Sequence, residues 1–220
     1  MFIKRRFFSF LLMTELSSMI ERAIDDVYQG KPILLVDSPN REDEGDFVIA
    51  AECVTYQNIG FLLTHSSRML CVSMQKERLH LLGLHPVVEQ PTKKGSCSFY
   101  TPVDARNGDT GLGIEDRLAV LDALLYDPVS VHHHDSRLSI PGHTFPLCAH
   151  PEGLLGRQGH TEGSLTLVEL AKLASAAVIA EAWDCERHRP LKGKYVGDFA
   201  REHAISVIAI DALLQYIQSK

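Results

Sequence analysis

An acidic run between two short apolar segments is the feature that most limits how this chain can fold. The continuous apolar runs at residues 32–36 and 47–51 are typical of buried strands. Between them, residues 41–46 hold four carboxylates and one guanidinium. Unpaired carboxylates repel one another unless a cation or a proton relieves the repulsion, so this loop favours a metal site or an acid of raised pKa. A solvated acidic turn is the competing interpretation, and the sequence leaves both open.

Helical and strand patterns alternate along the rest of the chain. Apolar residues recur at helical spacing over residues 16–27, and Gly30 supplies the stop. Farther along, we predict an irregular stretch at 129–142 and a strand at 144–149. No linker, repeat or low-complexity tract separates the elements. The sequence therefore predicts an α+β fold over residues 14–220, a single-domain α/β sandwich with a mixed sheet covered by helices.

The N-terminus has the polarity of a signal peptide but not its length. Lys4, Arg5 and Arg6 precede an apolar run that stops at Met13 after seven residues. No small-residue cleavage site follows, and the run falls well short of the roughly 20 residues that span a bilayer. We predict that residues 1–13 form a flexible N-terminal extension and that the protein has no membrane segment.

Charge and cysteine usage exclude other classes. The chain has 22 basic and 28 acidic residues, a formal charge of −6, and no Lys/Arg run able to neutralise a phosphate backbone. A nucleic-acid partner is therefore not expected. Five scattered cysteines without a C-x-x-C pair suit a reducing compartment, so we predict a cytoplasmic protein.

A glycine-rich turn at residues 156–162 is the second segment able to carry chemistry. Thr161 is a good N-cap for a following helix, and free N–H groups at a helix start attract phosphate. Arg157 can add a fork of donors, and His160 is a potential metal ligand. Such turns are also common without a ligand, so an ordinary helix start is the alternative.

Several histidines and one glutamate are weak signals when taken singly. His143 follows a Pro-Gly pair and Glu181 follows a buried strand, and both types of residue are more often structural or solvated. The run His132 to Asp135 could be a metal cluster. Consecutive imidazoles point in different directions on most backbones and lack the i, i+4 spacing of a shared helix face, so we interpret this run as a polar loop.

Taken together and in chain order, these segments resemble the 3,4-dihydroxy-2-butanone 4-phosphate synthase family of riboflavin biosynthesis. The matching segments are residues 36–37, 41–52, 65–66, 71–72, 110–111, 116–117, 141–147, 159–162 and Glu181. The resemblance covers about residues 20–208, which is most of the chain.

The resemblance implies a metal-dependent carbon–carbon lyase that converts D-ribulose 5-phosphate to 3,4-dihydroxy-2-butanone 4-phosphate and formate. It also implies an α/β sandwich, a homodimer whose active site can borrow residues across the interface, and Mg²⁺ or Mn²⁺ as cofactor. His143 and Glu181 match the catalytic pair, Glu42 and His160 match the metal ligands, and Cys71 matches a cysteine near the site. The implied substrate contacts are Arg41, Glu42, Asp46, Thr110, Arg157, Gln158, Gly159, His160, Thr161 and Glu181.

The chain departs from the family pattern around these positions. The family usually has two threonines before the glycine of the Thr-Gly turn, one of which helps at the phosphate, and here the first of them is Asp109. A carboxylate near a phosphate dianion would repel it. Ile140, Arg68 and Gly163 are further departures. A diverged paralogue acting on another sugar phosphate, and a catalytically silent ligand-binding homologue, are therefore the alternative functions.

Overall fold

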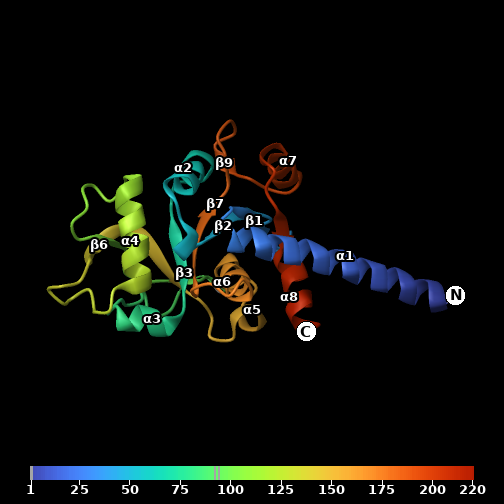
Figure 1. The fold of residues 1–220 in the computed structure, drawn as a ribbon, viewed down its shortest axis with the longest axis horizontal. Helices are drawn as coiled ribbons and strands as arrows, with labels where there is room; N and C mark the ends of the chain where they lie inside the picture. Colours follow the sequence, from blue (N-terminus) through green and yellow to red (C-terminus); the bar gives the residue numbers. More distant parts are fainter. Residues whose placement is uncertain (1, 92, 94) are drawn as a thin grey trace.

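The structure is a computed structural model that describes residues 2–91, 93 and 95–220, with side chains described from residue 15 onward. Its centre is an eight-stranded mixed sheet in the order β10-β1-β2-β7-β3-β6-β4, with β5 paired to β6 (Figure 1). The strands are β1 (Ile33–Val36), β2 (Gly45–Ala50), β3 (Cys71–Met74), β4 (Ser98–Phe99), β5 (Val103–Ala105), β6 (Leu138–Cys148), β7 (Ala176–Glu181) and β10 (Val207–Ala209). A separate two-stranded ribbon pairs β8 (Trp183–Asp184) with β9 (Arg189–Pro190).

Helices cover both faces of this sheet, because successive strand residues point to opposite sides. Leu34 and Phe47 pack in one core, whereas Leu35 and Val48 pack in the other. The helices are α1 (Phe2–Tyr28), α2 (Tyr56–His65), α3 (Lys76–Leu81), α4 (Ile114–Tyr126), α5 (Gly153–Gly156), α6 (His160–Leu170), α7 (Lys194–His203) and α8 (Ile210–Gln218), with a 3₁₀ turn at Ala51–Cys53. Figure 1 shows α2 and α7 on one side of the sheet and α1, α6 and α8 on the other. The predicted α+β sandwich with a mixed, helix-covered sheet is confirmed.

The sheet register brings the acidic run beside a residue far along the chain. β2 and β7 are antiparallel, and Asp46 lies directly opposite Glu181. On the other side of β7, Ile179 pairs with Cys71 of β3. Since α6 covers the same sheet face as Cys71 and Ile179, its first turn meets the ends of these strands. Four separate segments thus converge at one end of the sheet.

The prediction of an irregular stretch up to residue 142 is wrong, because β6 is extended from Leu138. Its first residues pair with β5, where Ser139 lies opposite Asp104 and Thr144 opposite Val103. The strands approach so closely at Gly142 that a Cβ there would lie 2.0 Å from the Val103 carbonyl carbon. Glycine is therefore required for the pairing of these two strands.

The first helix is longer than the sequence pattern indicated. Residues 2–13, predicted as an extension, continue α1 toward the N-terminus, and Figure 1 shows this part extending past α8 and away from the sheet. Its flexibility stays a prediction. Among the described residues, no helix is both long enough and apolar enough to cross a bilayer.

Candidate active site

The acidic loop between β1 and β2 folds around the buried carboxylate of Asp37. One Asp37 oxygen accepts the backbone N–H of Glu44 at 3.0 Å, and the other accepts Arg41 NH1 at 2.5 Å. Asp43 takes a positive φ of 55°, a conformation that Asp adopts more readily than most residues. These contacts fix the loop, so Glu42 and Asp46 are held in place beside the strand ends.

A cavity of about 610 Å³ lies where the acidic loop, β3, β7 and the start of α6 meet. We call it the acidic cavity. The sequence-predicted site residues among those that line it are Arg41, Glu42, Asp46, Arg157, His160, Thr161 and Glu181. The acidic loop therefore faces a cavity rather than solvent alone, and the Gly-His-Thr turn contributes to the same cavity.

Two carboxyl groups that line the acidic cavity, those of Glu181 and Asp46, have raised pKa values. Burial raises the pKa of Glu181 to about 7, and a hydrogen bond with Glu44 and repulsion from its carboxylate act in the same direction. Glu44 in turn pairs with Lys192, whose Nζ lies 2.8 Å from Glu44 Oε1. Burial also raises the pKa of Asp46, while nearby His160 opposes that shift. The cavity thus contains one carboxyl group, that of Glu181, able to carry a proton near neutral pH.

His160 contributes a nearly buried imidazole to the acidic cavity. It is 7% exposed, and its Nε2 is a buried atom without a hydrogen-bond partner among the described residues. Its Nδ1 lies 3.8 Å from Asp46 Oδ2. Ligand atoms of Asp37, Glu42 and His160 all lie within 4.8 Å of one another. A buried nitrogen without a partner beside carboxylates fits a divalent cation, which would satisfy the nitrogen and reduce the repulsion.

Arg157 lines the acidic cavity as a fixed donor. Its Nε donates to the Gly95 carbonyl at 2.9 Å, and its NH1 pairs with Glu162 at 2.6 Å. Glu162 is 1% exposed and also accepts the His150 N–H at 3.0 Å. The guanidinium is therefore held at the cavity wall with part of its donor set already engaged.

The helix start in this turn differs from the prediction. α6 begins at His160 with Gly159 as N-cap, so Thr161 lies inside the first turn and the predicted Thr161 N-cap is wrong. A Cβ at Gly159 would lie 2.4 Å from Arg157 Nη1, so any larger residue there would displace the guanidinium. Gln158 is exposed. Among the described residues, neither Gln158 nor Gly159 belongs to the lining of the acidic cavity.

His143 and Thr110 lie in a second cluster, which the structure keeps apart from the acidic cavity. His143 is half-exposed on β6, and its Nδ1 lies 2.7 Å from Asp104 Oδ2. The turn at residues 107–111 packs on Asp104, since a Cβ at Gly111 would lie 2.4 Å from Asp104 Oδ2. Of the described residues that line the acidic cavity, none comes from this cluster. We call Asp104, Thr110, Gly111, Asp116 and His143 the Asp104 group.

Sequence reasoning missed the partners of the predicted site residues. Asp37 positions Arg41, Glu44 shares a hydrogen bond with Glu181, and Lys93 Nζ lies 3.8 Å from Glu42 Oε1. Asp37 and Glu44 lie in or beside the acidic run, so its density was a usable signal. Lys93 lies in a segment without periodicity and gave none. Cys71 lines the cavity as predicted, and burial raises the pKa of its thiol.

Comparison with known proteins bears out the resemblance. The family model described as 3,4-dihydroxy-2-butanone 4-phosphate synthase matches residues 21–216. The chain is 32% identical over 204 residues to the 3,4-dihydroxy-2-butanone 4-phosphate synthase of Hamiltonella defensa subsp. Acyrthosiphon pisum, covering 91% of this chain and 90% of that protein. It is 34% identical over 198 residues to the riboflavin biosynthesis protein RibBA of Chlamydia muridarum, covering 90% of this chain but only 46% of that relative.

The fold agrees with solved structures. A 3,4-dihydroxy-2-butanone 4-phosphate synthase in complex with two magnesium ions aligns with a TM-score of 0.82 at 29% identity, covering 91% of this chain and 97% of that one. The synthase of Candida albicans aligns with a TM-score of 0.79 at 31% identity, covering 90% of this chain and 96% of that one.

Proposed function

The chain belongs to the 3,4-dihydroxy-2-butanone 4-phosphate synthase family, and we propose that it converts D-ribulose 5-phosphate to 3,4-dihydroxy-2-butanone 4-phosphate and formate in riboflavin biosynthesis. The single observation that carries this proposal is the convergence of Glu42, Asp46, His160 and Glu181 on one cavity. The substrate loses a proton next to its ketone, loses water, rearranges its carbon skeleton and, after a water molecule adds back, releases its fourth carbon as formate. Every step moves protons between adjacent oxygens and carbons, which requires several acid and base groups close together.

Glu181 is the proposed proton carrier within the cavity. A group whose pKa lies near 7 gives and takes protons efficiently at neutral pH, and the pKa of Glu181 is about 7 because of burial and Glu44. Asp46 lies directly opposite Glu181 in the sheet register, and burial raises its pKa too. Two carboxyl groups side by side can serve neighbouring atoms of a small sugar. This arrangement supports acid and base catalysis on a bound polyol.

Glu42 and His160 are the proposed ligands of Mg²⁺ or Mn²⁺. The unpartnered Nε2 of His160 and the nearby Glu42 carboxylate support the assignment. When bound, such an ion polarises a ketone oxygen and adjacent hydroxyls. Asp37, which already accepts hydrogen bonds from Arg41 and Glu44, holds the loop that carries Glu42. The enzyme is therefore proposed as a metal-dependent carbon–carbon lyase.

The substrate's phosphate is proposed to bind at the α6 end of the cavity. Arg157 and Thr161 line that end, and the backbone of Gln158, Gly159 and His160 forms the turn there. First-turn N–H groups and a fixed guanidinium both favour an anion. Arg41 and Asp46, which also line the cavity, are proposed to contact the sugar hydroxyls. Anchoring the remote phosphate would hold the reacting carbons against Glu181.

His143 and Thr110 are proposed to act in a homodimer, at the cavity of a second copy. Asp104 accepts from both the backbone N–H and the ring of His143, so the imidazole is oriented while its side chain remains 53% exposed. Met69 and Leu112 are large apolar side chains exposed near the cavity and the Asp104 group, respectively. An oriented, exposed imidazole beside exposed apolar side chains supports a contact between copies.

A formate assay with D-ribulose 5-phosphate and Mg²⁺ tests the proposed function. We expect formate and the four-carbon phosphate in equal amounts. Turnover of another phosphosugar only would favour the diverged paralogue. Tight binding of ribulose 5-phosphate without formate would favour the silent homologue.

Complementation between variants tests the shared site. His143→Ala and Glu181→Gln should each be inactive alone, and mixed subunits should regain activity because one cavity per heterodimer is intact. No recovery in a demonstrated heterodimer would contradict the shared site, and light scattering that gives 24.5 kDa at micromolar concentration would contradict the dimer.

The proposal also includes the cellular location of the protein. All five cysteines are free thiols, which suits a reducing environment, and we keep the cytoplasm as the expected location.

A further inference from the structure

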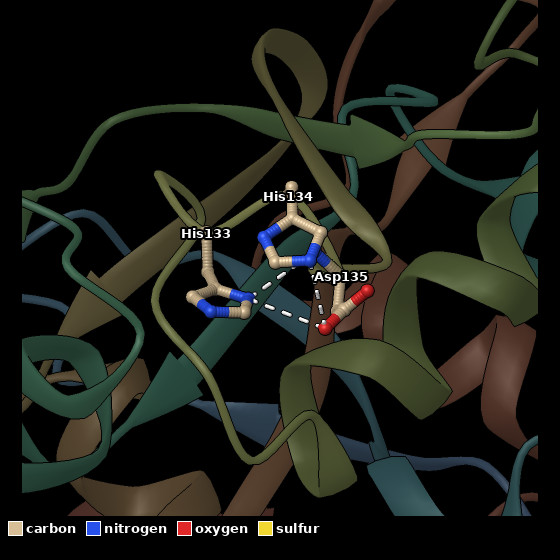
Figure 2. A group of neighbouring side chains, drawn as sticks. All are labelled: His133, His134 and Asp135. Carbon is tan, nitrogen blue, oxygen red and sulfur yellow. Dashed lines mark hydrogen bonds and ion pairs between the residues drawn. The ribbon is translucent and has the colours of Figure 1, made fainter.

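Two consecutive histidines and the aspartate after them converge at the tip of the loop between α4 and β6. His134 Nε2 lies 3.3 Å from Asp135 Oδ2, and His133 Nδ1 lies 3.7 Å from the same oxygen (Figure 2). Ligand atoms of the three residues all lie within 4.8 Å of one another. The sequence favoured imidazoles that point apart, but these two rings lie 4.4 Å apart at an angle of only 32°. The turn therefore gathers the side chains on one side.

We propose that His133, His134 and Asp135 form a surface site for Zn²⁺. Zinc binds imidazole nitrogen and carboxylate oxygen at about 2.0–2.2 Å, so tetrahedral ligand atoms lie about 3.3 Å apart. The two imidazole-to-carboxylate distances are close to that spacing. Two nitrogens and one oxygen suit Zn²⁺ better than Mg²⁺, which prefers oxygen ligands. Water would complete the coordination, because all three side chains are exposed.

The loop beneath the three side chains is fixed by buried contacts. Asp127, which is 1% exposed, accepts the Ser136 hydroxyl at 3.1 Å and the Arg137 N–H at 2.7 Å. Arg106 NH2 donates to the carbonyls of Val131 and His133, at 3.0 and 3.3 Å. A ligand set on a rigid turn loses little conformational freedom when it binds an ion, so this loop is preorganised.

The site is separate from the acidic cavity. None of its three residues is among the described residues that line that cavity, and the loop lies at the end of the molecule opposite the N-terminus of α1 (Figure 1). His133 Nδ1 accepts the backbone N–H of Asp135 at 3.2 Å, so the lone pair of this nitrogen is directed at that N–H. Zinc would replace that weak contact with a bond.

Zinc titration of the full chain tests the proposal. The Cys185→Ser variant serves as background, because Cys185 is an exposed thiol that could bind zinc. Excess Mg²⁺ is added to compete with Zn²⁺ for the Glu42 and His160 site proposed in the acidic cavity. We expect calorimetry to show one Zn²⁺ per chain that weakens at least about tenfold in His134→Ala and in Asp135→Asn, since even losing a supporting partner of a metal ligand costs this much. His132→Ala, which changes an exposed neighbour outside the cluster, is the matched control and should bind Zn²⁺ unchanged.

Imidazole ¹⁵N spectra identify the ligands directly. Zinc should shift the resonances of His133 Nδ1 and His134 Nε2 and leave His132 unmoved. Affinity that is equal in His134→Ala, Asp135→Asn and the background protein would overturn the proposal. So would the absence of zinc binding, or zinc shifts confined to other histidines. Because the readouts are binding and spectra, these outcomes do not depend on the proposed synthase activity.

Discussion

The acidic cavity and the Asp104 group both contain several carboxylates, but the surroundings of these carboxylates differ. In the cavity they lie close to one another, and in the Asp104 group they accept hydrogen bonds. In the cavity, burial and neighbouring carboxylates raise the pKa of Glu181 to about 7, and His160 keeps a buried nitrogen without a described partner. In the Asp104 group, Asp104 accepts two hydrogen bonds from His143, and Asp116 accepts the N–H groups of the 107–111 turn. In the acidic cavity the unpartnered nitrogen of His160 leaves a place for a ligand, whereas the Asp104 and Asp116 carboxylates of the Asp104 group fix the local backbone.

This contrast predicts that removing a carboxylate has different effects on stability in the two regions. Removing a crowded carboxylate from the cavity relieves repulsion, so activity should fall while stability holds or rises. Removing a matched carboxylate from the Asp104 group leaves donors without partners, so stability should fall as well. Paired measurements of turnover and melting temperature therefore test whether the two regions differ in this way.

The largest effect is expected at the proposed metal ligands. Glu42→Gln and His160→Ala should each lower Mg²⁺-dependent formate release by at least about 100-fold, because each removes a ligand and second-sphere losses alone cost 10- to 100-fold. Formate release across a range of Mg²⁺ concentrations measures this. Glu89→Gln changes an exposed carboxylate outside the cavity and is the control. Most activity surviving in either ligand variant would remove the metal assignment.

Glu181→Gln is expected to have the next largest effect. The amide preserves shape and can still donate a hydrogen bond to Glu44, but it cannot exchange a proton. We expect kcat to fall by about 10²- to 10⁴-fold, the usual contribution of a positioned acid or base. The melting temperature should hold or rise, because one member of a repelling pair is now neutral. Glu186→Gln, at an exposed site, is the control, and unchanged turnover in Glu181→Gln would show that this carboxyl carries no essential proton.

Asp104→Asn should reduce both the stability of the protein and its turnover. The variant keeps a carbonyl oxygen but removes the charge that orients His143, and one of two hydrogen bonds loses its acceptor. We expect a loss of about 1–3 kcal/mol in the free energy of unfolding and roughly tenfold in turnover. Urea denaturation and the formate assay measure the two effects. A variant that loses activity with full stability would place Asp104 with the cavity carboxylates and contradict the comparison.

Local patterns predicted the parts of this site but not their pairing. The two buried strands, the acidic run and the turn before α6 are all visible in short stretches of sequence, since each depends on neighbouring residues. The contact between His143 and Asp104 depends on the β5–β6 register, which closes only because Gly142 lacks a side chain. The convergence of His133 and His134 likewise depends on distant anchors such as Arg106. Contacts set by long-range pairing leave no periodic signal.

Asp109→Thr should have the smallest effect, and it tests whether the Asp104 group faces a phosphate. Asp109 is exposed, and its backbone N–H donates to Asp116 Oδ1 at 2.9 Å. A threonine at this position keeps that backbone hydrogen bond. The melting temperature should therefore stay unchanged. If a second copy's cavity meets this turn, the Asp109 charge repels the substrate phosphate, at a cost on the order of 1 kcal/mol in a partly wet site. We then expect KM for ribulose 5-phosphate to fall roughly five- to tenfold with the metal requirement unchanged. Glu115→Gln, another exposed carboxylate nearby, should leave KM as it is. An unchanged KM in Asp109→Thr would mean that this carboxylate faces water as an ordinary turn residue, and the Asp104 group would lose its proposed place beside the phosphate.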